Sequence, residues 1–484
     1  MKLIYNVKDK PKFGQVIVFA LQQLLAIMAA TIAVPAIINQ GMGLAGQDAM
    51  SATAALFGAG VGTLVYLLFT KFKSPVFLGS SFAFLGSMFA AFAGAGSVVA
   101  LGYLGLVIGA AFAGLVYVVI AIVVKFAGTK WINKIMPAVV IGPTVSIIGL
   151  GLAGNAVGDL QTSGTAYKVA QDIVENGEVV STQLVTRQDT SVYVCIICGL
   201  VTLAVTMLCS VFGKKMLKMI PFIIGILSGY AVAAIFTVIG TATGNDALKV
   251  INFSLFSDIK WLPDFTFIKA FGGFKDVSGS FIATIAAAYI PVAFVVFAEH
   301  IADHKNLSSV IGTDLTKDPG LHRTLLGDGV GSMAGAFFGG CPNTTYGECI
   351  ACVAISGNAS VITVCTTAVL AILVSFIGPF ATFLASIPAC VMGGVCIALY
   401  GFIAVSGLKM IQKVDLGDNR NLFVVSIVLI SGIGGLALTF GQITITNVAC
   451  AVILGILTNL MLNSKKKAAT TATTETVEVS DENK

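Results

Sequence analysis

The chain has 484 residues, of which 57% are hydrophobic and 11% are charged, and its formal net charge is +5. Soluble proteins carry roughly 25% charged residues, and the mean hydropathy here is +0.95. These values exclude a soluble globular protein and indicate an integral membrane protein. Most apolar runs are about 20 residues long, which is the length of a membrane-spanning helix rather than of a barrel strand.

Fourteen apolar segments follow one another along the chain, and we predict that each enters or crosses the membrane. The first follows several lysines, continues as a full span and ends in no small-residue cleavage site, so we predict a first transmembrane helix and no signal peptide. The predicted segments are about 14–39, 49–70, 75–91, 99–124, 132–153, 192–212, 219–240, 280–301, 323–340, 344–356, 359–377, 380–406, 421–440 and 445–463.

The distribution of basic residues predicts the orientation. With the N-terminus in the cytoplasm, all but six of the 28 Lys and Arg residues fall on the cytoplasmic side, so the positive-inside rule places both termini there. The two long outer loops, about 154–191 and 241–279, have mixed charge, and the first contains a strand-like stretch, Glu178–Gln183. We expect the Thr- and Glu-rich tail, 465–484, to be disordered. The six outer basic residues are Lys168, Arg187, Lys249, Lys260, Lys269 and Lys275.

Two of the segments contain residues that interrupt a helix. The third segment places Pro, Gly and three serines within 74–84, and the tenth has a similar stretch at 339–347. Both patterns predict an extended stretch that turns into a half-helix, and such backbone is tolerated at membrane depth only inside protein or beside water. The segments divide into seven plus seven, so any structural repeat would be inverted. The two breaks therefore indicate one central binding site.

Two acidic residues, Glu299 and Glu348, lie within apolar sequence of membrane length. A buried carboxylate in lipid is unfavourable unless it faces a cavity, has a partner or binds something, so we expect a transport site. Asp303 shares a helix face with Glu299, where like charges repel unless one is protonated or bound. Carboxylate acceptors beside the N–H donors of a half-helix suit a neutral ligand with N–H and C=O groups. The aromatic face of Phe82 or Tyr346 would suit a ligand with a flat ring.

Structural roles are the alternatives for these acids. Glu299 and Asp303 could be helix-end acids near the cytoplasmic surface, and Glu348 could cap its half-helix. His300 and His304 are also four residues apart and could share a metal ion, but no second His or Cys cluster supplies further ligands. We expect His300 to be an interior hydrogen-bonding residue and His304 to face the cytoplasmic loop.

The sequence shows no motif that establishes enzymatic, redox or ATP-driven chemistry. The ten cysteines lie mostly in apolar segments and are expected to be packing residues, even though Cys195 and Cys198 form a CxxC. The sequence contains no GxxxxGK[ST] loop, no Ser–His–Asp arrangement and no HExxH. We therefore expect neither an enzyme nor a transporter driven by ATP bound to this chain.

Five stretches together resemble the nucleobase–ascorbate transporter type of the nucleobase–cation symporter family, and they are most similar to its bacterial uracil permease branch. The resemblance runs through nearly all membrane segments, and the string Asn–Thr–Thr–Tyr–Gly–Glu at 343–348 is highly specific. The stretches are Leu21–Pro35, Leu78–Phe84, Ala298–Asp303, Asp318–Arg323 and Pro342–Glu348.

The resemblance implies an all-α membrane protein with fourteen spans in an inverted seven-plus-seven repeat, usually a homodimer. A core domain, 14–127 and 280–377, would move against a gate domain, 130–240 and 380–464. Short extended strands in segments 3 and 10 would hold the substrate between them.

The resemblance also implies how uracil would be held. Glu299 and Glu348 would accept hydrogen bonds from the pyrimidine N–H groups, and backbone around Phe82 and Gly347 would meet the carbonyls. The walls would be formed by Ala30 and Tyr346, with Phe82 near the ring.

Glu299, with Asp303 beside it, is the expected proton carrier, since a buried carboxyl can change its protonation with substrate and exposure. Asp303 stands where the uracil permease pattern has a His, and Gln23 stands where a His is often found in the first segment, so the base preference or proton relay can differ. We expect proton–uracil symport by alternating access in the plasma membrane, with lipid contacts, no cofactor and no nucleic-acid partner. The alternatives are a purine (xanthine or urate) symporter, sodium coupling, and a metal-ion or anion transporter.

Overall fold

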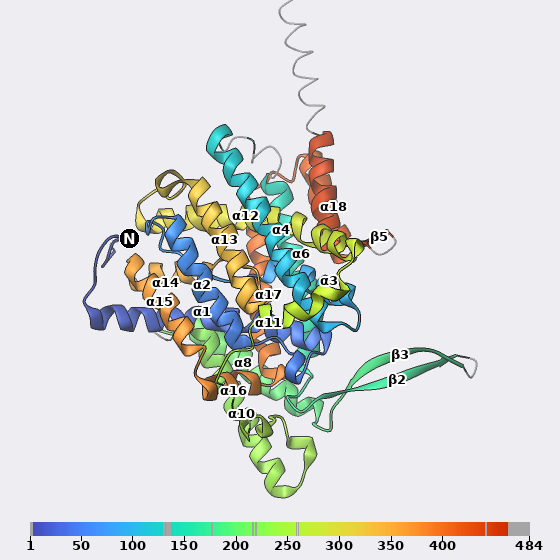
Figure 1. Cartoon of the computed structure of the whole chain (residues 1–484). Helices are drawn as coiled ribbons and strands as arrows, with labels where there is room; N and C mark the ends of the chain where they lie inside the picture. The colour runs from blue at the N-terminus through green and yellow to red at the C-terminus, as the bar shows by residue number, and fades with distance from the viewer. Residues whose placement is uncertain are drawn as a thin grey trace, which may run out of the picture.

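The computed structural model describes residues 3–128, 131, 137–175, 178–214, 217, 220–257, 259, 261–440 and 443–462. The tail predicted to be disordered, 465–484, lies outside the described residues. Helices form one body, from which the hairpin β2–β3 projects (Figure 1). In the first half of the chain the elements are α1 (Phe13–Met42), η1 (Gly46–Asp48), α2 (Ala52–Phe69), β1 (Leu78–Ser80), η2 (Phe82–Phe84), α3 (Leu85–Ala95), α4 (Val99–Ala127), α6 (Ala138–Gly151), α7 (Ala153–Leu160), β2 (Tyr167–Glu175), β3 (Glu178–Arg187), α8 (Val192–Phe212) and α10 (Pro221–Thr243). The later elements are η3 (Asp246–Leu248), η4 (Phe253–Ser257), α11 (Thr266–Phe271), η5 (Gly272–Asp276), α12 (Gly279–Ile311), η6 (Thr316–Gly320), α13 (Leu321–Gly339), β4 (Asn343–Thr345), α14 (Gly347–Ser356), α15 (Val361–Val374), α16 (Gly378–Ser386), α17 (Ala389–Ile411), α18 (Asn419–Ile433), β5 (Leu438–Phe440), β6 (Ile443–Ile445) and a last helix, Asn447–Leu462.

The structure confirms the predicted membrane-type helical class. Within the described residues, eight helices are long and apolar enough to cross a membrane, and a ninth span is counted if α15 and α16, which are bent by 85°, form one. Several other apolar helices, including α14 and α18, have only 10–17 residues. Each of the fourteen predicted segments overlaps at least one helix, while the number of crossings stays a prediction.

Several predicted segments differ in extent from the helices, most clearly in two places. The segment 380–406, predicted as one helix, is two helices, because α16 ends at Ser386 and Pro388 then precedes α17; a proline ring cannot continue a helix that arrives from its N-terminal side. The segment predicted to end near residue 301 is α12, which continues to Ile311. This second difference changes the environment of the residues after Glu299.

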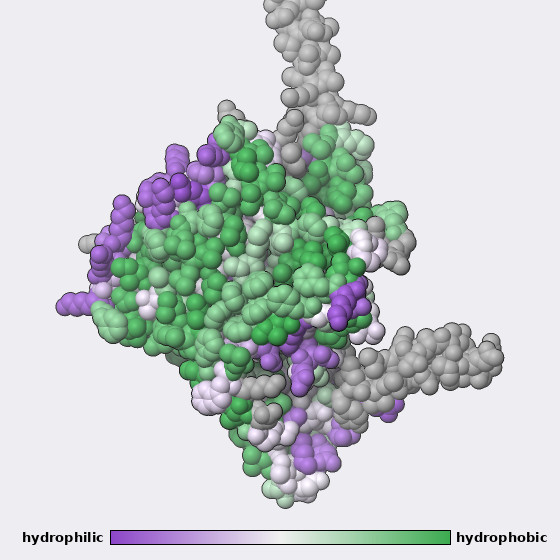
Figure 2. All heavy atoms as spheres, viewed as in Figure 1, coloured by the Kyte–Doolittle hydropathy of each residue, from purple (hydrophilic) through white to green (hydrophobic). Residues whose placement is uncertain are grey.

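The outer surface of the helical body is apolar. Figure 2 shows a broad hydrophobic belt with hydrophilic residues gathered at opposite edges of it. On α4, Leu115, Val119, Ile122 and Phe126 are all at least half exposed and recur at helical spacing. Such a stripe would be an aggregation hazard in water and is the expected surface toward lipid.

Short antiparallel strand pairs interrupt the helices. The strand predicted at Glu178–Gln183 is confirmed, because it lies in β3, which pairs with β2. A third pair, β5 and β6, precedes the last helix. The pair with functional interest joins β1 to β4, which are the two breaks predicted in segments 3 and 10.

Close helix crossings place this pair deep in the molecule. Helix α13 packs along both α2 and α4, and glycines allow the approach: a Cβ on Gly62 of α2 would lie 2.6 Å from the carbonyl oxygen of Gly331 on α13. Small residues at such crossings are the usual means of close packing in membranes. Strand β1 is therefore held beside α2 and α13.

Candidate functional site

The two broken segments satisfy each other's backbone groups. Strands β1 and β4 are fully buried and pair antiparallel, with Leu78 opposite Thr345. The pairing continues beyond the strands, because the Tyr346 N–H donates to the Phe77 carbonyl at 3.2 Å. The Thr63 hydroxyl of α2 accepts from the Leu78 N–H at 2.9 Å and donates to its carbonyl at 3.2 Å. Backbone outside a helix needs such partners at membrane depth.

The predicted acids surround this strand pair. Helix α12 packs against η2, β4 and α14. The Glu299 carboxyl is near enough to those of Asp303 and Glu348 for their negative charges to repel one another. Glu299 is exposed although its neighbours on either side are buried, Glu348 and Asp303 are half-buried, and Gly347 is exposed at the start of α14. Solvent therefore reaches a cluster of three carboxyls beside the N-terminal end of half-helix α14. All three cannot be ionised without repelling one another.

One of these acids is tied to the strand pair. The Thr345 hydroxyl of β4 donates to Asp303 Oδ2 at 2.6 Å, so one carboxylate oxygen of Asp303 already has a partner. Glu348 lies in the first turn of α14, where the helix dipole favours a negative charge. Glu299 is thus the acid most open to a ligand.

The predicted wall residues divide into two kinds. Ala30 and Tyr346 are buried, and the Tyr346 hydroxyl donates to the Ser80 carbonyl at 2.9 Å. Phe82 is only half-buried, and its ring meets the ring of Tyr400 on α17 edge-on at 6.1 Å. Phe82 is therefore the accessible aromatic face, and Tyr346 holds β1 in place.

The two histidines of α12 lie inside the protein. The interior hydrogen-bonding role predicted for His300 is confirmed, but the prediction that His304 faces a loop is wrong, since both are fully buried. Their rings stack with centroids 4.0 Å apart, and His304 Nε2 lies 2.7 Å from the Tyr66 hydroxyl of α2. The cause is the length of α12, which keeps His304 within the helical body. Among the described residues, no three His, Cys, Asp or Glu side chains form a group that could hold a metal ion.

Sequence reasoning missed an acid that is almost fully buried, Asp328 of α13. Its Oδ2 lies 2.7 Å from His300 Nδ1, and the other ring nitrogen, Nε2, lies 3.0 Å from the Thr324 hydroxyl. That hydroxyl donates to the Leu321 carbonyl, so it accepts from Nε2–H, and a proton must lie between Nδ1 and the carboxyl. The signal was available, because an acid between Gly327 and Gly329 inside a membrane-length helix meets the same rule that identified Glu299.

Gln23, at the position where a His is often found, serves as a cross-link. It is buried, its Nε2 donates to Cys349 Sγ at 2.7 Å, and its Oε1 accepts from the Thr367 hydroxyl at 3.0 Å. Gln23 therefore joins α1 to α14 and α15 directly behind Glu348.

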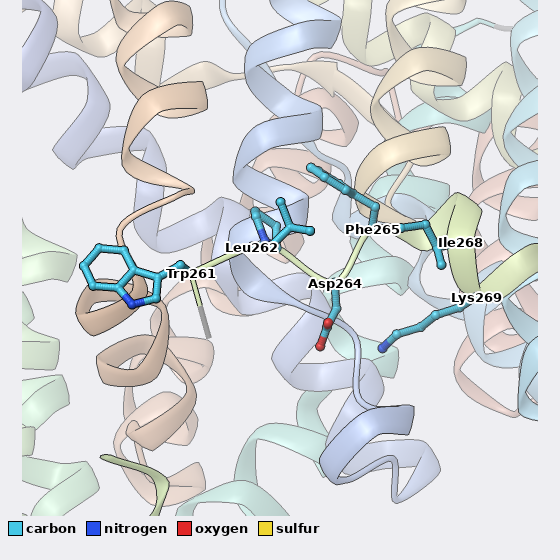
Figure 3. Close-up of a pocket in the computed structure, with 7 residues that line it drawn as sticks. Trp261, Leu262, Asp264, Phe265, Ile268 and Lys269 are labelled. Atoms are coloured by element: carbon cyan, nitrogen blue, oxygen red, sulfur yellow. The ribbon is translucent and has the colours of Figure 1, made fainter. Parts of the chain in front are cut away.

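A surface hollow of about 360 Å³ lies elsewhere, where α11 begins (Figure 3). None of the residues lining it belongs to the predicted site, so the hollow and the carboxyl cluster are separate features. Its lining residues are Trp261, Leu262, Pro263, Asp264, Phe265, Ile268 and Lys269.

Comparison with known proteins finds full-length relatives. The family model described as Permease family matches residues 14–440. The uracil permease of Bacillus caldolyticus is 38% identical over 474 residues, covering 97% of this chain and 96% of that protein. The uracil permease of Bacillus subtilis (strain 168) is 37% identical over 477 residues, covering 96% and 97%. That of Escherichia coli (strain K12) is 34% identical over 453 residues, covering 93% and 92%.

Solved structures share the fold at much lower identity. The transmembrane domain of the cyanobacterial bicarbonate transporter BicA superposes with a TM-score of 0.56 at 16% identity, covering 94% of this chain and 99% of that one. The murine anion transporter Slc26a9 in its inward-facing state gives 0.61 at 12% identity, covering 95% and 70%. At these identities the likeness concerns the fold.

Proposed function

This chain belongs to the Permease family, as its motifs predicted, which makes it a membrane transporter and not an enzyme, and from that membership we propose that it carries uracil across the membrane. The names of three full-length relatives support this substrate. The observation that carries the proposal is the placement of Glu299 and Glu348 around the β1–β4 pair, where solvent reaches both.

The chemistry of the site suits a pyrimidine with N–H and C=O groups. Glu299 and Glu348 would each accept a hydrogen bond from a ring N–H, and the backbone near Phe82 and Gly347 would meet the carbonyls. The half-buried ring of Phe82 supplies an apolar face. Ala30 and Tyr346 would limit the width of the site from behind.

The same site argues against an anion substrate, although two structural neighbours are named as bicarbonate and anion transporters. An anion site should present a positive group between the half-helices, as helix N-termini do when assisted by Arg or Lys. Here the side chains are the acids Glu299, Asp303 and Glu348. Their charge would repel an anion.

Proton coupling is the second part of the proposal. Glu299 would bind the proton, because it is the most exposed of three mutually repelling carboxyls, and Asp303 would assist it. Protonation removes a negative charge and so lowers the repulsion within the cluster, and symport requires that substrate and proton favour each other's binding. Sodium is the alternative coupling ion.

Alternating access is the third part. We assign the core domain to 14–127 and 280–377 and the gate domain to 130–240 and 380–464, with fourteen spans in an inverted repeat. The edge-on contact of Phe82 with Tyr400 would join core to gate beside the substrate. We place the protein in the plasma membrane, in contact with lipid, as a homodimer with both termini cytoplasmic.

Uptake into proteoliposomes tests the proposal. Labelled uracil should accumulate under an inward proton gradient, and a protonophore should abolish accumulation. Unlabelled uracil should compete and xanthine should not. Competition by xanthine would support the purine alternative. Accumulation that requires sodium and is insensitive to the protonophore would show that sodium, and not the proton, is the coupling ion.

A further inference from the structure

The N-terminal stretch Leu3–Asp9, here called the strap, is bonded along its backbone to the connection between α14 and α15. The N–H groups of Ile4 and Tyr5 both donate to the Gly357 carbonyl, at 2.7 and 3.2 Å, and the Ala359 N–H donates to the Tyr5 carbonyl at 2.9 Å. Figure 1 shows the N-terminal end of the chain beside α14 and α15. Residues far apart in sequence thus form a short parallel bridge.

The contact continues along the strap. The Val361 N–H donates to the Val7 carbonyl at 3.1 Å, and the Ser360 hydroxyl donates to the Asp9 carbonyl at 2.7 Å. Side chains of the strap alternate between half-buried and exposed, and a turn within it is closed by the Asp9 N–H, which donates to the Asn6 carbonyl at 3.1 Å. The strap is therefore an ordered element with a fixed register.

The strap holds the far end of the helix that carries Glu348. Helix α14 has ten residues, from Gly347 to Ser356, and Gly357 is its C-cap. A helix this short is not stable alone, so its position depends on what holds its two ends. Near its first turn the Cys349 thiol accepts from the Gln23 amide. At its last turn the Gly357 carbonyl accepts the two strap donors.

We propose that the strap is a positioning segment for Glu348, which it holds in register with Glu299 by fixing the C-terminal end of α14. This rests on the proposed function, in which both carboxylates bind one ligand. Ligand binding depends on the placement of both carboxylates relative to one another, and a displacement of about 1 Å is enough to weaken such an interaction strongly. Among the described residues the strap makes no hydrogen bond to either carboxylate, so its proposed effect on Glu348 passes through α14.

Two substitutions in the full chain test the proposal. Ile4→Pro removes the donor of the 2.7 Å bond, and Ser360→Ala removes the hydroxyl bonded to Asp9. Ile4→Ala is the matched control, because the Ile4 side chain is 64% exposed and the backbone N–H is kept. Hydrogen–deuterium exchange of α14 amides is measured without uracil, and uptake is then measured in proteoliposomes.

We expect amide exchange in α14 to rise about tenfold in the Ile4→Pro/Ser360→Ala protein, while exchange in α4 and α12 stays unchanged. The KM for uracil should rise roughly five- to tenfold with kcat changed less than about twofold. Ile4→Ala should match the parent protein in both measurements.

Unchanged amide exchange in α14 would overturn the proposal, because it would mean that the strap does not hold this helix. An equal rise of exchange in all helices would also overturn it, because the strap would then stabilise the whole protein rather than α14. Faster exchange in α14 with an unchanged KM would overturn the positioning role. If the parent protein takes up no uracil, the proposed function fails, and the exchange measurement still decides whether the strap holds α14.

Discussion

The hydroxyl of Thr345 donates a 2.6 Å hydrogen bond to the carboxylate of Asp303, which ties strand β4 to helix α12. The same helix carries Glu299 one turn earlier, and the same strand leads directly into the half-helix with Glu348. A single side-chain bond therefore relates the two halves of the carboxyl cluster. It also distinguishes Asp303, which has a protein partner, from Glu299, which is open to solvent.

Thr345→Val should lower uracil affinity by about three- to tenfold, because it removes a bond to a charged group without changing the shape of the side chain. Thr345→Ser keeps the hydroxyl and should bind as the parent protein does. Equilibrium binding of labelled uracil to purified protein measures both. Parental binding by the Val variant together with weakened binding by the Ser variant would mean that the methyl contact, and not the hydrogen bond, matters.

Glu299→Gln and Glu348→Gln should each weaken uracil binding by ten- to hundredfold, since a hydrogen bond to a charged group contributes about 1.5–3 kcal/mol. The two should differ in coupling. Uptake by Glu348→Gln at high uracil should remain sensitive to a protonophore, and uptake by Glu299→Gln should not. Normal accumulation by Glu299→Gln in a proton gradient would remove this residue from the coupling site.

Asp328→Ala should destabilise the protein by about 1–3 kcal/mol, because His300 Nδ1 is left buried without a partner. Asp328→Asn should cost much less, since the amide can donate to that nitrogen while Nε2 keeps its bond to Thr324. Thermal unfolding in lipid nanodiscs compares the two. If Asn and Ala lower the midpoint equally, the proton between Asp328 and His300 does not stabilise the fold.

Gly79→Ala should weaken uracil binding by at least about fivefold, because a Cβ at this position of β1 would collide with the Tyr346 ring. The ring would have to move and its bond to the Ser80 carbonyl would break; overpacking of this kind costs about 1–3 kcal/mol. Gly86→Ala is the control, as nothing lies within 4 Å of a Cβ there. Uracil binding by the Gly79→Ala protein at parental affinity would show that the strand tolerates the ring's displacement.

The sequence was sufficient to find features that break a strong local rule. Acids such as Glu299 and Glu348 in membrane-length apolar runs incur a large energetic penalty, and helix-breaking residues in two such runs incur the further cost of an interrupted helix. The structure confirms the two breaks and adds that they pair as β1 and β4. The pairing itself depends on a contact between distant segments, for which neither strand carries a local signal.

Other features depended on helix length and on three-dimensional neighbours. His304 was placed at a loop because its segment was expected to end near residue 301, whereas α12 continues to Ile311 and keeps the ring beside Tyr66. Asp328 was missed because its glycine-rich helix is weakly apolar, even though its burial follows the same rule as that of other membrane acids. Pro388 is a clear signal for the break between α16 and α17, and the prediction of one apolar segment over 380–406 was wrong because it ignored this proline.

The order in which the ribosome makes the chain gives the Thr63 contact a further consequence. Strand β1 is complete long before Thr345 of β4 exists, and at about 5–20 residues per second the wait lasts roughly 13–50 s. During that time the Phe77 carbonyl lacks its partner on the other strand, the Tyr346 N–H, in a half-built membrane protein. The hydroxyl of Thr63 lies in α2, only fifteen residues earlier in the chain, and holds both polar groups of Leu78. We expect it to shelter the nascent strand, so that Thr63→Val slows the appearance of protease-resistant protein in a pulse–chase experiment.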